Sequence, residues 1–420
     1  MSGSWQSDLR VDADRVVAEL TELAAISDCP EPPPAVTRVV FTETDLRARD
    51  YLRSLYEEAG LVVRVDAIGN TFARWEGADP RAAAVGTGSH CDAIPHSGTY
   101  DGTLGVVGAL ESIRALRRAG YRPHRSIDLV MFTSEEPTRF GVGCTGSRLM
   151  SGAMTPAELA DLTDDAGDGY DAVRQRAGFT GDLASVRLPS DAYAAFVELH
   201  IEQGPHLEAA GVPIGAVTAI AAPATLDFTV TGEGGHAGGV MMADRRDALA
   251  AAAEMIAAIE SIVLDAERPD LVGTVGVVDV HPGAINSIPD RVRFTLDLRD
   301  VDGEARDRVL TAVQQRCDAI AERRSVGLER HVLNADPPAT CAAAVIEATE
   351  HAAERLGLAS RRMVSRAYHD SLFMARVAPT GMIFIPCRGG VSHRPDEYAS
   401  PEAIDAGVAT LALVLAELAK

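Results

Sequence analysis

Four short apolar segments in this chain end in, or lead through a short loop to, side chains that can bind metal ions. The segments lie within RAAAVGTGSH, RSIDLVMFTSEE, AYAAFVELH and TGMIFIPCRGG. Imidazoles and carboxylates gather at the end of each one. The residues concerned are His90 and Asp92, Asp101 on the loop that follows them, Glu135 and Glu136, His200, and His393.

This set of side chains favours divalent metal chemistry. Imidazoles and carboxylates without a thiolate suit Zn²⁺, Mn²⁺ or Co²⁺, and they are poor ligands for iron–sulfur or copper–thiolate centres. Two ions need about twice the ligands of one, together with a carboxylate that bridges them. The residues that can supply such a site are His90, Asp101, Glu136, His200 and His393.

Glu135 is left outside this ligand set, directly before Glu136. Two ions about 4 Å apart can activate a water molecule and polarise a carbonyl group. A free carboxylate beside them can take the proton of that water and pass it to a leaving amine. The pattern therefore predicts a metal-dependent hydrolase with Glu135 as its general base.

These residues can act together only if the four segments are strands whose ends meet. Short apolar runs that alternate with helices, such as the one expected over residues 103–120, are typical of a buried, mainly parallel sheet. The carboxyl ends of parallel strands line one crevice. The alternative is a scatter of unrelated surface residues, because an isolated HxD motif or EE pair is more often structural than functional.

Residues 217–330 follow a different pattern, which predicts an inserted domain. Strand and helix signals occur there in the order β-α-β-β-α-β, which is the ferredoxin-like arrangement. We therefore expect an α/β protein with two domains. Residues 1–216 and 331–420 would form a mainly parallel-sheet metallohydrolase domain, and residues 217–330 an α+β dimerisation or lid domain.

The composition limits the partners and the compartment. A net charge of −22 disfavours nucleic acid or an anionic membrane surface, although a few local cations can still hold a small carboxylate. The six cysteines are scattered without a CxxC pair, which indicates reduced thiols. We see no signal peptide and no membrane-spanning segment. We therefore expect a cytoplasmic protein that binds a small molecule, and neither nucleic acid nor a membrane.

Several local patterns indicate structure rather than chemistry. Thr42, with Asp45 three residues later, predicts the start of a helix that ends at Gly60. A hairpin is expected to turn near residues 69–70. GVGCTGSR, at residues 141–148, contains a literal GxGxxG, but no acidic ribose partner is obvious, so we expect a tight turn packed behind the general base.

Two further residues beside the ligands are expected to play no part in metal binding. Cys91 stands between His90 and Asp92, and in a strand it points to the opposite side. His96 lies on the same stretch as the ligands, and a solvated role is favoured for it over ligation.

The chain resembles the M20 metallopeptidases, and specifically their amidase branch of N-carbamoyl amino acid hydrolases, allantoate amidohydrolases and ureidoglycolate amidohydrolases. The matching stretches run from about residue 36 to residue 398: GSHCDAIPHSGTYDG, FTSEEPTRFG, ELHIEQGPHLE, GEGGHAGG, HPGAINSIP, DLRD and GGVSHRPDEY. The longer stretches SGTYDGTLGVVGALE and RAYHDSLFMARVAPTGMIFIPCRGGVSHRPDEYAS are most similar to the ureidoglycolate group.

The resemblance implies a role for each matching residue. His90 and His200 would bind one ion, Glu136 and His393 the other, and Asp101 would bridge the two. Glu135 would be the general base, and Asp92 would orient His90. His236, in the inserted domain, would reach the active site of a partner subunit and steady the oxyanion. The residues expected to hold the carboxylate and ureido ends of the substrate are Gln203, Asn286, Arg299 and His369.

The resemblance also implies the reaction, which would cleave a ureido or carbamoyl C–N bond of a small carboxylate. The substrate first expected from the resemblance is ureidoglycolate, an intermediate of purine breakdown, which would give glyoxylate, ammonia and CO₂. The enzyme would be a homodimer with two divalent ions per chain, most simply Mn²⁺, with Zn²⁺ or Co²⁺ as alternatives. Allantoate and N-carbamoyl-L-amino acids are the rival substrates. A peptidase, or a non-catalytic binding protein of the same fold, is disfavoured.

Two departures from the carbamoylase pattern bear on the substrate. The chain reads HAGGVMM at residues 236–242, where many carbamoylases read HAGTTPM. It also has AYHDS at residues 367–371, so that Tyr368 stands where a glycine is usual. The first favours the ureidoglycolate group, and the second indicates a smaller substrate pocket.

Overall fold

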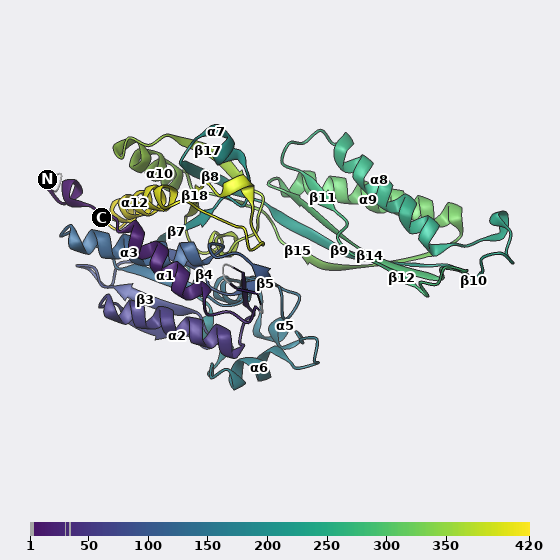
Figure 1. Ribbon diagram of the computed structural model, residues 1–420, viewed down its shortest axis with the longest axis horizontal. Helices are drawn as coiled ribbons and strands as arrows, with labels where there is room; N and C mark the ends of the chain where they lie inside the picture. Colours follow the sequence, from purple (N-terminus) through teal and green to yellow (C-terminus); the bar gives the residue numbers. More distant parts are fainter. Residues whose placement is uncertain (1–3, 30, 33–34) are drawn as a thin grey trace. The chain divides into compact units, whose positions relative to one another are not determined.

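The structure, a computed structural model, describes residues 4–29, 31–32 and 35–420. The chain divides into two compact units (Figure 1). The first unit consists of Met1–Thr218, Cys341–Met363 and His369–Lys420, and the second of Ala219–Thr340 and Val364–Tyr368. The assignment of catalysis to the first and dimerisation to the second remains a prediction.

A nine-stranded sheet runs through the first unit. Its order is β16-β8-β18-β7-β4-β6-β3-β2, with β17 paired to β8, and a separate antiparallel pair is formed by β1 and β5. The bounds are β1 (Val36–Arg38), β2 (Val62–Val65), β3 (Thr71–Trp75), β4 (Ala84–His90), β5 (Ala93–Ser97), β6 (Ile127–Phe132), β7 (Tyr193–Ile201), β8 (Ile214–Ile220), β16 (Ala339–Thr340), β17 (Ser360–Ser365) and β18 (Thr380–Ile385).

The four apolar segments singled out in the sequence are the adjacent strands β18, β7, β4 and β6, and all of them are parallel. Their side chains alternate between two cores: Val197 and Leu199 of β7 pack on one face, and Phe196 packs on the other. Because both faces are covered, the strands are apolar at nearly every position. The predicted buried, mainly parallel sheet is confirmed.

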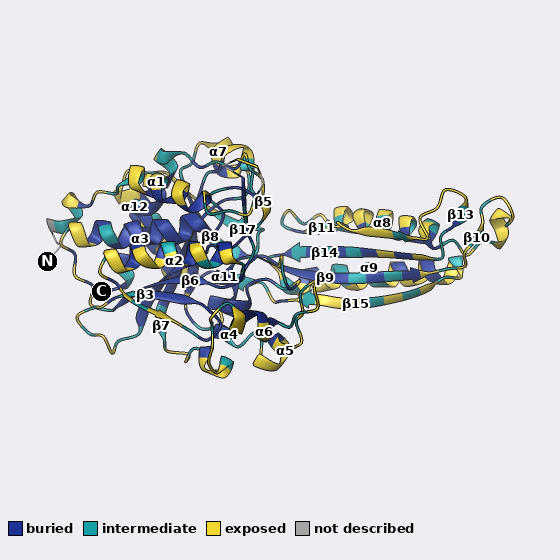
Figure 2. Cartoon of the chain, turned by 60° about the horizontal axis from the view of Figure 1, so that its bottom comes forward, coloured by how far each residue is buried: buried dark blue, intermediate teal, exposed yellow. Residues whose placement is uncertain are grey.

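Helices cover both faces of this sheet. One core cluster joins α1, α2, α3, α10 and α12, and a second includes residues of α4, α5, α6 and α11. Figure 2 colours the buried residues of α3 and α12 dark blue. The bounds are α1 (Ala13–Ala24), α2 (Glu43–Glu58), α3 (Thr103–Arg118), α4 (Thr145–Ser151), α5 (Pro156–Ala160), α6 (Tyr170–Arg176), α7 (His206–Ala210), α10 (Ala343–Arg355), α11 (Asp370–Met374), α12 (Pro401–Leu418) and the 3₁₀ turns Ser4–Asp8, Leu183–Val186 and Arg388–Gly390.

The local predictions hold in the first unit. Thr42 caps α2 by accepting a hydrogen bond from the N–H of Asp45, and the Asp45 carboxylate accepts one from the N–H of Phe41. Strands β2 and β3 form the expected antiparallel hairpin. The helix expected over residues 103–120 is α3. Among the described residues, no helix is both long and apolar enough to cross a membrane.

The second unit is built on an antiparallel sheet of order β11-β14-β9-β15, with β12 also paired to β14. Helices α8 and α9 share one core with this sheet, so it alternates between buried and more exposed residues. This is the ferredoxin-like arrangement that the sequence predicts. The bounds are β9 (Ala222–Thr231), β10 (Gly235–His236), α8 (Ala248–Asp265), β11 (Val272–Thr274), β12 (Val278–His281), β13 (Ser287–Ile288), β14 (Arg291–Asp300), α9 (Gly303–Arg324), β15 (Gly327–Ala335) and the 3₁₀ turn Met242–Asp244.

Candidate dinuclear metal site

The four parallel strands deliver their polar residues to the same edge of the sheet. His90 is the last residue of β4, and His200 is the second-last residue of β7. Glu135 and Glu136 follow β6, and His393 lies on the loop after β18. Parallel pairing of these strands places all their carboxyl ends together.

Asp101 lies between two groups of potential ligands. Its Oδ1 atom is 3.6 Å from His90 Nε2 and 3.3 Å from His200 Nε2. Its Oδ2 atom is 3.3 Å from His393 Nε2, which lies 3.1 Å from Glu136 Oε1. Within each group the ligand atoms lie within 4.8 Å of one another. Asp101 has the position of a bridge, and the nitrogen and oxygen donors fit two divalent ions.

Backbone carbonyls hold the two buried imidazoles in one tautomer. His90 Nδ1 is 3.0 Å from the carbonyl oxygen of Asp92, and His200 Nδ1 is 2.9 Å from that of Ile201. Because a carbonyl oxygen only accepts hydrogen bonds, each Nδ1 must carry the proton. In the neutral ring, Nε2 then carries the lone pair, and in both histidines this atom lies on the side of Asp101, where it can bind a metal ion.

Asp92 contacts His90 in a different way from the one expected. The backbone carbonyl of Asp92, rather than its carboxylate, accepts the imidazole hydrogen bond, and its Oδ1 atom is 3.7 Å from His90 Nδ1. The carboxylate accepts hydrogen bonds from the N–H groups of Glu135 and Glu136, at 3.3 and 2.9 Å. The side chain of Asp92 therefore holds the backbone of the two glutamates, while its main chain orients the histidine.

Gly102 lets the loop after Asp101 approach the ligands closely. Its φ is +67°, and an added Cβ would lie 2.4 Å from His90 Nε2. Its N–H donates to His200 Nε2 at 3.1 Å. A larger residue would both strain the backbone and displace the imidazole, so this position requires glycine.

Glu135 is buried beside the ligands but belongs to neither ligand group. Its Oε2 atom is 3.6 Å from His90 Nε2, and the Cys144 thiol donates to its Oε1 atom at 3.7 Å. Burial raises the pKa of Glu135 well above its usual value. The charges of Glu136 and Asp370 add to the rise, and His90 opposes it. A buried carboxyl of this kind is suited to proton transfer.

The GxGxxG segment is the tight turn that the sequence predicts behind Glu135. The N–H of Cys144 donates to the carbonyl of Glu135, and that of Gly146 to the carbonyl of Thr133, both at 2.9 Å. An added Cβ at Gly143 would lie 2.3 Å from the Glu135 carbonyl oxygen. The glycines therefore serve close packing of two backbone segments.

Opposite charges dominate the pKa values of the histidines and carboxylates in this site. Burial alone would lower the pKa of His90, but Glu135, Asp101 and Asp92 raise it well above its usual value. Hydrogen bonds to Asp101 and Glu136 raise the pKa of His393 to about 11. Burial would raise the pKa of Asp101, yet hydrogen bonds from the histidines hold it well below its usual range. The histidines and Asp101 therefore stabilise one another in their charged forms.

Gln203 and His369, the two predicted substrate residues in the first unit, both lie against the ligands. Gln203 Nε2 donates to Asp101 Oδ2 at 2.6 Å, and its buried Oε1 atom has no hydrogen-bond partner among the described residues. The buried ring of His369 lies 4.6 Å from that of His200. The structure brings both beside the metal groups.

The three predicted residues of the second unit lie at two places in it. His236 and Asn286 are exposed and adjacent: β10 pairs with β13, and the N–H of Ala237 donates to the Asn286 carbonyl. Arg299 forms a bidentate ion pair with Asp297 near the end of β14. The other end of β14 is residue 291, which comes shortly after β13 in the chain. Arg299 lies roughly 27 Å along the strand from that residue.

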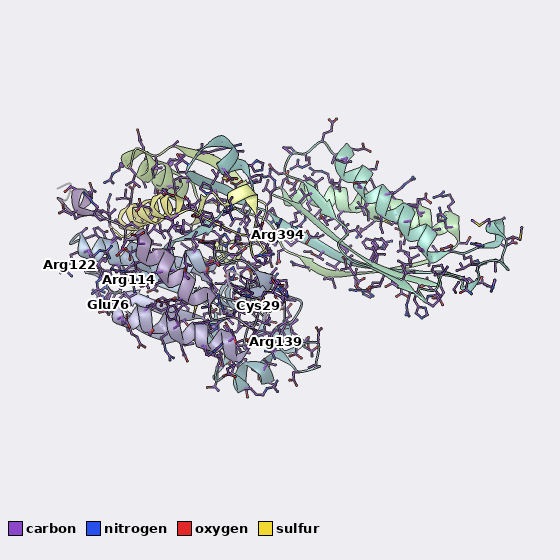
Figure 3. The ribbon with its side chains drawn as sticks, viewed as in Figure 1. Cys29, Glu76, Arg114, Arg122, Arg139 and Arg394 are labelled. Carbon is purple, nitrogen blue, oxygen red and sulfur yellow. The ribbon has the colours of Figure 1, made fainter. Side chains whose placement is uncertain are left out.

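The two residues excluded as ligands lie outside both groups. Cys91 is buried in a hydrophobic core. His96 is exposed, and its Nδ1 atom lies 3.5 Å from the sulfur of Cys29, which is labelled in Figure 3. With Glu31 these two form a separate group with metal-ligand spacing.

Sequence reasoning missed three buried carboxylates around the site. Glu198 accepts hydrogen bonds from the hydroxyls of Ser89 and Ser371, each at 2.6 Å. Asp370 follows His369 directly, and Glu397 lies on the loop of His393. A signal was present for Glu198, because residues 198 and 200 of one strand share a face.

Comparisons with known proteins agree with this geometry. The family model described as Peptidase family M20/M25/M40 matches residues 86–417. A ureidoglycolate hydrolase of Arabidopsis thaliana is 50% identical over 98% of this chain and 88% of its own length. An N-carbamoyl-L-amino acid amidohydrolase of Geobacillus stearothermophilus is 40% identical over 98% of this chain and 99% of its own.

A solved structure gives the same result for the fold. The crystal structure of AtUAH in complex with glyoxylate superposes with a TM-score of 0.91 at 48% identity, covering 99% of this chain and 100% of that one. The similarity therefore includes the inserted region as well as the strand-end ligands. From the ligand arrangement and these matches together, we conclude that the chain belongs to the M20/M25/M40 peptidase family, in its amidase and carbamoylase branch.

Proposed function

We propose that this protein is a dinuclear-metal amidohydrolase that converts ureidoglycolate to glyoxylate, ammonia and CO₂. The observation that carries the proposal is full-length similarity to ureidoglycolate hydrolases, at 50% identity, in a chain that keeps both ligand groups and a buried carboxylate outside them. Water adds to the ureido carbonyl, and cleavage of both C–N bonds releases ammonia, CO₂ and hydroxyglycine. Loss of ammonia from hydroxyglycine then leaves glyoxylate.

In this mechanism the protein positions the reactants and moves the proton. His90, Asp101 and His200 would hold one ion, and Asp101, Glu136 and His393 the other. When bound, the ions would polarise the ureido carbonyl and increase the acidity of water. Glu135 accepts the proton of the attacking water and passes it to the departing nitrogen. Its buried position and its contact with Cys144 support this role.

Substrate contacts are divided between the two units in this proposal. Gln203 and His369 lie against the ligands, and the unpaired Gln203 Oε1 atom can accept a hydrogen bond from a ureido N–H. Arg299 offers a planar donor pair for the carboxylate. Tyr368 stands where relatives are expected to have glycine, and this favours a small substrate over an N-carbamoyl amino acid with a bulky side chain.

The proposal also includes a homodimer. Asn286 belongs to the β10–β13 end of the second unit, whereas Arg299 lies near the far end of β14, roughly 27 Å along that strand, so one small substrate is not expected to touch both residues of a single copy. We propose that His236 and Asn286 come from the partner subunit, with His236 steadying the oxyanion. Mn²⁺ is the proposed metal, and the six unpaired cysteines support a reducing, cytoplasmic location.

A substrate panel tests the function. Protein loaded with Mn²⁺ is expected to release ammonia from ureidoglycolate with a higher kcat/KM than from allantoate or N-carbamoyl-L-amino acids. Parallel samples with Zn²⁺ and Co²⁺ test the choice of metal. A faster reaction with either rival substrate would reassign the activity within the family, and no ammonia from any of the three would refute the proposal.

The mechanism has its own test. Glu135→Gln keeps the shape of the side chain but removes the base, and we expect kcat to fall by about 10²–10⁴-fold. Metal analysis should still find two ions per chain, because Glu135 lies outside both ligand groups. Near-normal turnover of this variant would contradict the assignment of Glu135 as general base.

A further inference from the structure

The loop that carries His393 contains a second buried acidic residue. Glu397 is only 3% exposed, and it lies four residues after His393. The N–H of Glu397 donates to the carbonyl of Arg394, which is labelled in Figure 3. This hydrogen bond folds the loop into a turn. The turn directs the Glu397 side chain toward the loop of Asp101 rather than into water.

The carboxylate of Glu397 holds the main chain at the bridging residue. Its Oε1 atom accepts hydrogen bonds from the N–H groups of Tyr100, at 2.6 Å, and Asp101, at 3.0 Å. A buried carboxylate that accepts two backbone hydrogen bonds fixes the position of that backbone. The contact spans almost 300 residues of sequence, so no local element could supply it.

The other oxygen of Glu397 is connected to the Asp101 side chain through Ser392. The Ser392 hydroxyl lies 2.8 Å from Glu397 Oε2 and 2.6 Å from Asp101 Oδ2. A hydroxyl has one proton, so it donates to one of these oxygens at a time. Ser392 precedes His393 directly, and the same network therefore joins the loop of His393 to both the backbone and the carboxylate of Asp101.

Packing around Glu397 shows that its position is built into the fold. An added Cβ at Gly98 would lie 2.3 Å from Glu397 Cβ and 2.6 Å from its Oε1 atom. Only a residue without a side chain leaves this space. The neighbouring rings of Tyr100 and Tyr398 meet edge to face, with centroids 6.1 Å apart, and extend the contact between the two loops.

We propose that Glu397 is a positioning residue for the dinuclear site, which sets the separation between the bridging carboxylate of Asp101 and the imidazole of His393. The inference rests on the proposed function, because it concerns the same pair of metal ions. Glu397 belongs to neither ligand group and acts only through the two loops that it joins. Outer residues that orient metal ligands typically change metal affinity by about 10–100-fold when they are replaced.

Metal binding, rather than turnover, tests this role. We call the ion that Asp101, Glu136 and His393 would hold the second ion. We expect Glu397→Ala to weaken binding of this second Mn²⁺ ion by at least about tenfold in a calorimetric titration. The exchange-coupled spectrum of a Mn²⁺ pair in electron paramagnetic resonance should decrease in proportion. Glu397→Gln keeps an acceptor for the two N–H groups and should lose less affinity for the second ion than Glu397→Ala. If both variants bound two ions with the wild-type affinities, the inference would be overturned.

Glu111→Ala serves as the matched control. Glu111 is also a fully buried carboxylate that accepts a backbone N–H, from Asp12, and it pairs with Arg118 rather than with any site residue. Its loss should lower Tm while both ions still bind. If Glu111→Ala lost the second ion as readily as Glu397→Ala, general destabilisation would explain both results and the inference would fail.

Gly98→Ala provides an independent variant in case Glu397→Ala does not fold. The added methyl group would displace Glu397 without removing it, and it should reproduce the loss of the second ion. Retention of both ions with wild-type affinity would count against the inference. Wild-type protein that binds two ions but does not cleave ureidoglycolate would refute only the proposed substrate, so the two failures are distinguishable.

Discussion

His90 and His236 are both predicted to act in one reaction, yet their surroundings are opposite. His90 is 1% exposed, its Nδ1 atom is held by a backbone carbonyl, and Gly102 packs against its ring. His236 is exposed on a two-residue strand, and its Nδ1 atom accepts a hydrogen bond from the N–H of Gly238, two residues away. The His90 ring is enclosed by the loops of Asp101 and Glu135, whereas the exposed His236 ring has its hydrogen bond within its own loop.

This contrast extends to the neighbours of each residue. The candidate ligands in the first unit are tied together by hydrogen bonds of Asp92, Gln203 and Glu397. At the β10–β13 end of the second unit, exposed apolar residues accompany His236, among them Met241, Met242 and Ile285. The first region is a buried, hydrogen-bonded cluster, and the second is an exposed surface with apolar side chains, which we propose is covered by another chain.

The largest expected effect tests whether the second region works in trans. His236→Ala should lower kcat by about 10²–10³-fold if the imidazole steadies the oxyanion. A mixture of His236→Ala and Glu135→Gln subunits should then regain about a quarter of wild-type activity, because one site in each mixed dimer is complete. The measurement is ammonia release before and after subunit exchange.

His331→Ala is the control for this experiment, since His331 is another exposed histidine of the second unit. It should leave the activity unchanged. Mixtures that regain nothing, from subunits that do exchange, would show that His236 does not act across a dimer.

The next largest effect is the release of protons from His90 and His393 when a metal ion binds. Hydrogen bonds to Asp101 and Glu136 raise the pKa of His393 to about 11, and the pKa of His90 is raised as well, so both imidazoles favour binding a proton. A metal ion requires the neutral imidazole, so binding must release these protons, and the apparent affinity must increase as the pH rises. Titration calorimetry of Mn²⁺ in two buffers of different ionisation enthalpy should detect release of at least about one proton per chain at pH 7. Binding without proton release would contradict the electrostatic description of the site.

The smallest effect concerns the contact between Cys144 and the general base. Cys144→Ala removes the thiol that reaches Glu135 Oε1 but keeps the backbone hydrogen bonds of the turn. We expect kcat to fall by less than about tenfold, because one weak S–H donor is lost and the carboxylate remains. Cys317→Ala, at a buried cysteine of the second unit, should leave kcat unchanged. Equal kcat values for the two variants would show that the thiol does not influence Glu135.

Much of the site could be predicted because its ligands stand at fixed places relative to secondary structure. The apolar runs ending near His90, Glu135, His200 and His393 predict parallel strands, and parallel strands share one edge. The contact of Asp92 could not be predicted in the same way, because the sequence does not show whether its main-chain or its side-chain oxygen accepts the hydrogen bond from His90. Glu397 could not be assigned a role from the GGVSHRPDEY stretch, since nothing local indicates which loop its side chain supports.

The fold class, the family and a set of candidate metal ligands could be inferred from the sequence alone, because periodicity, strand ends and motif spacing are local properties. Only the tertiary structure decided which Asp101 oxygen faces which histidine, which part of Asp92 holds His90, and which carboxylate braces the bridging loop. These are contacts between residues far apart in the chain. Their geometry depends on how strands and loops pack in three dimensions, and no spacing along the chain encodes it.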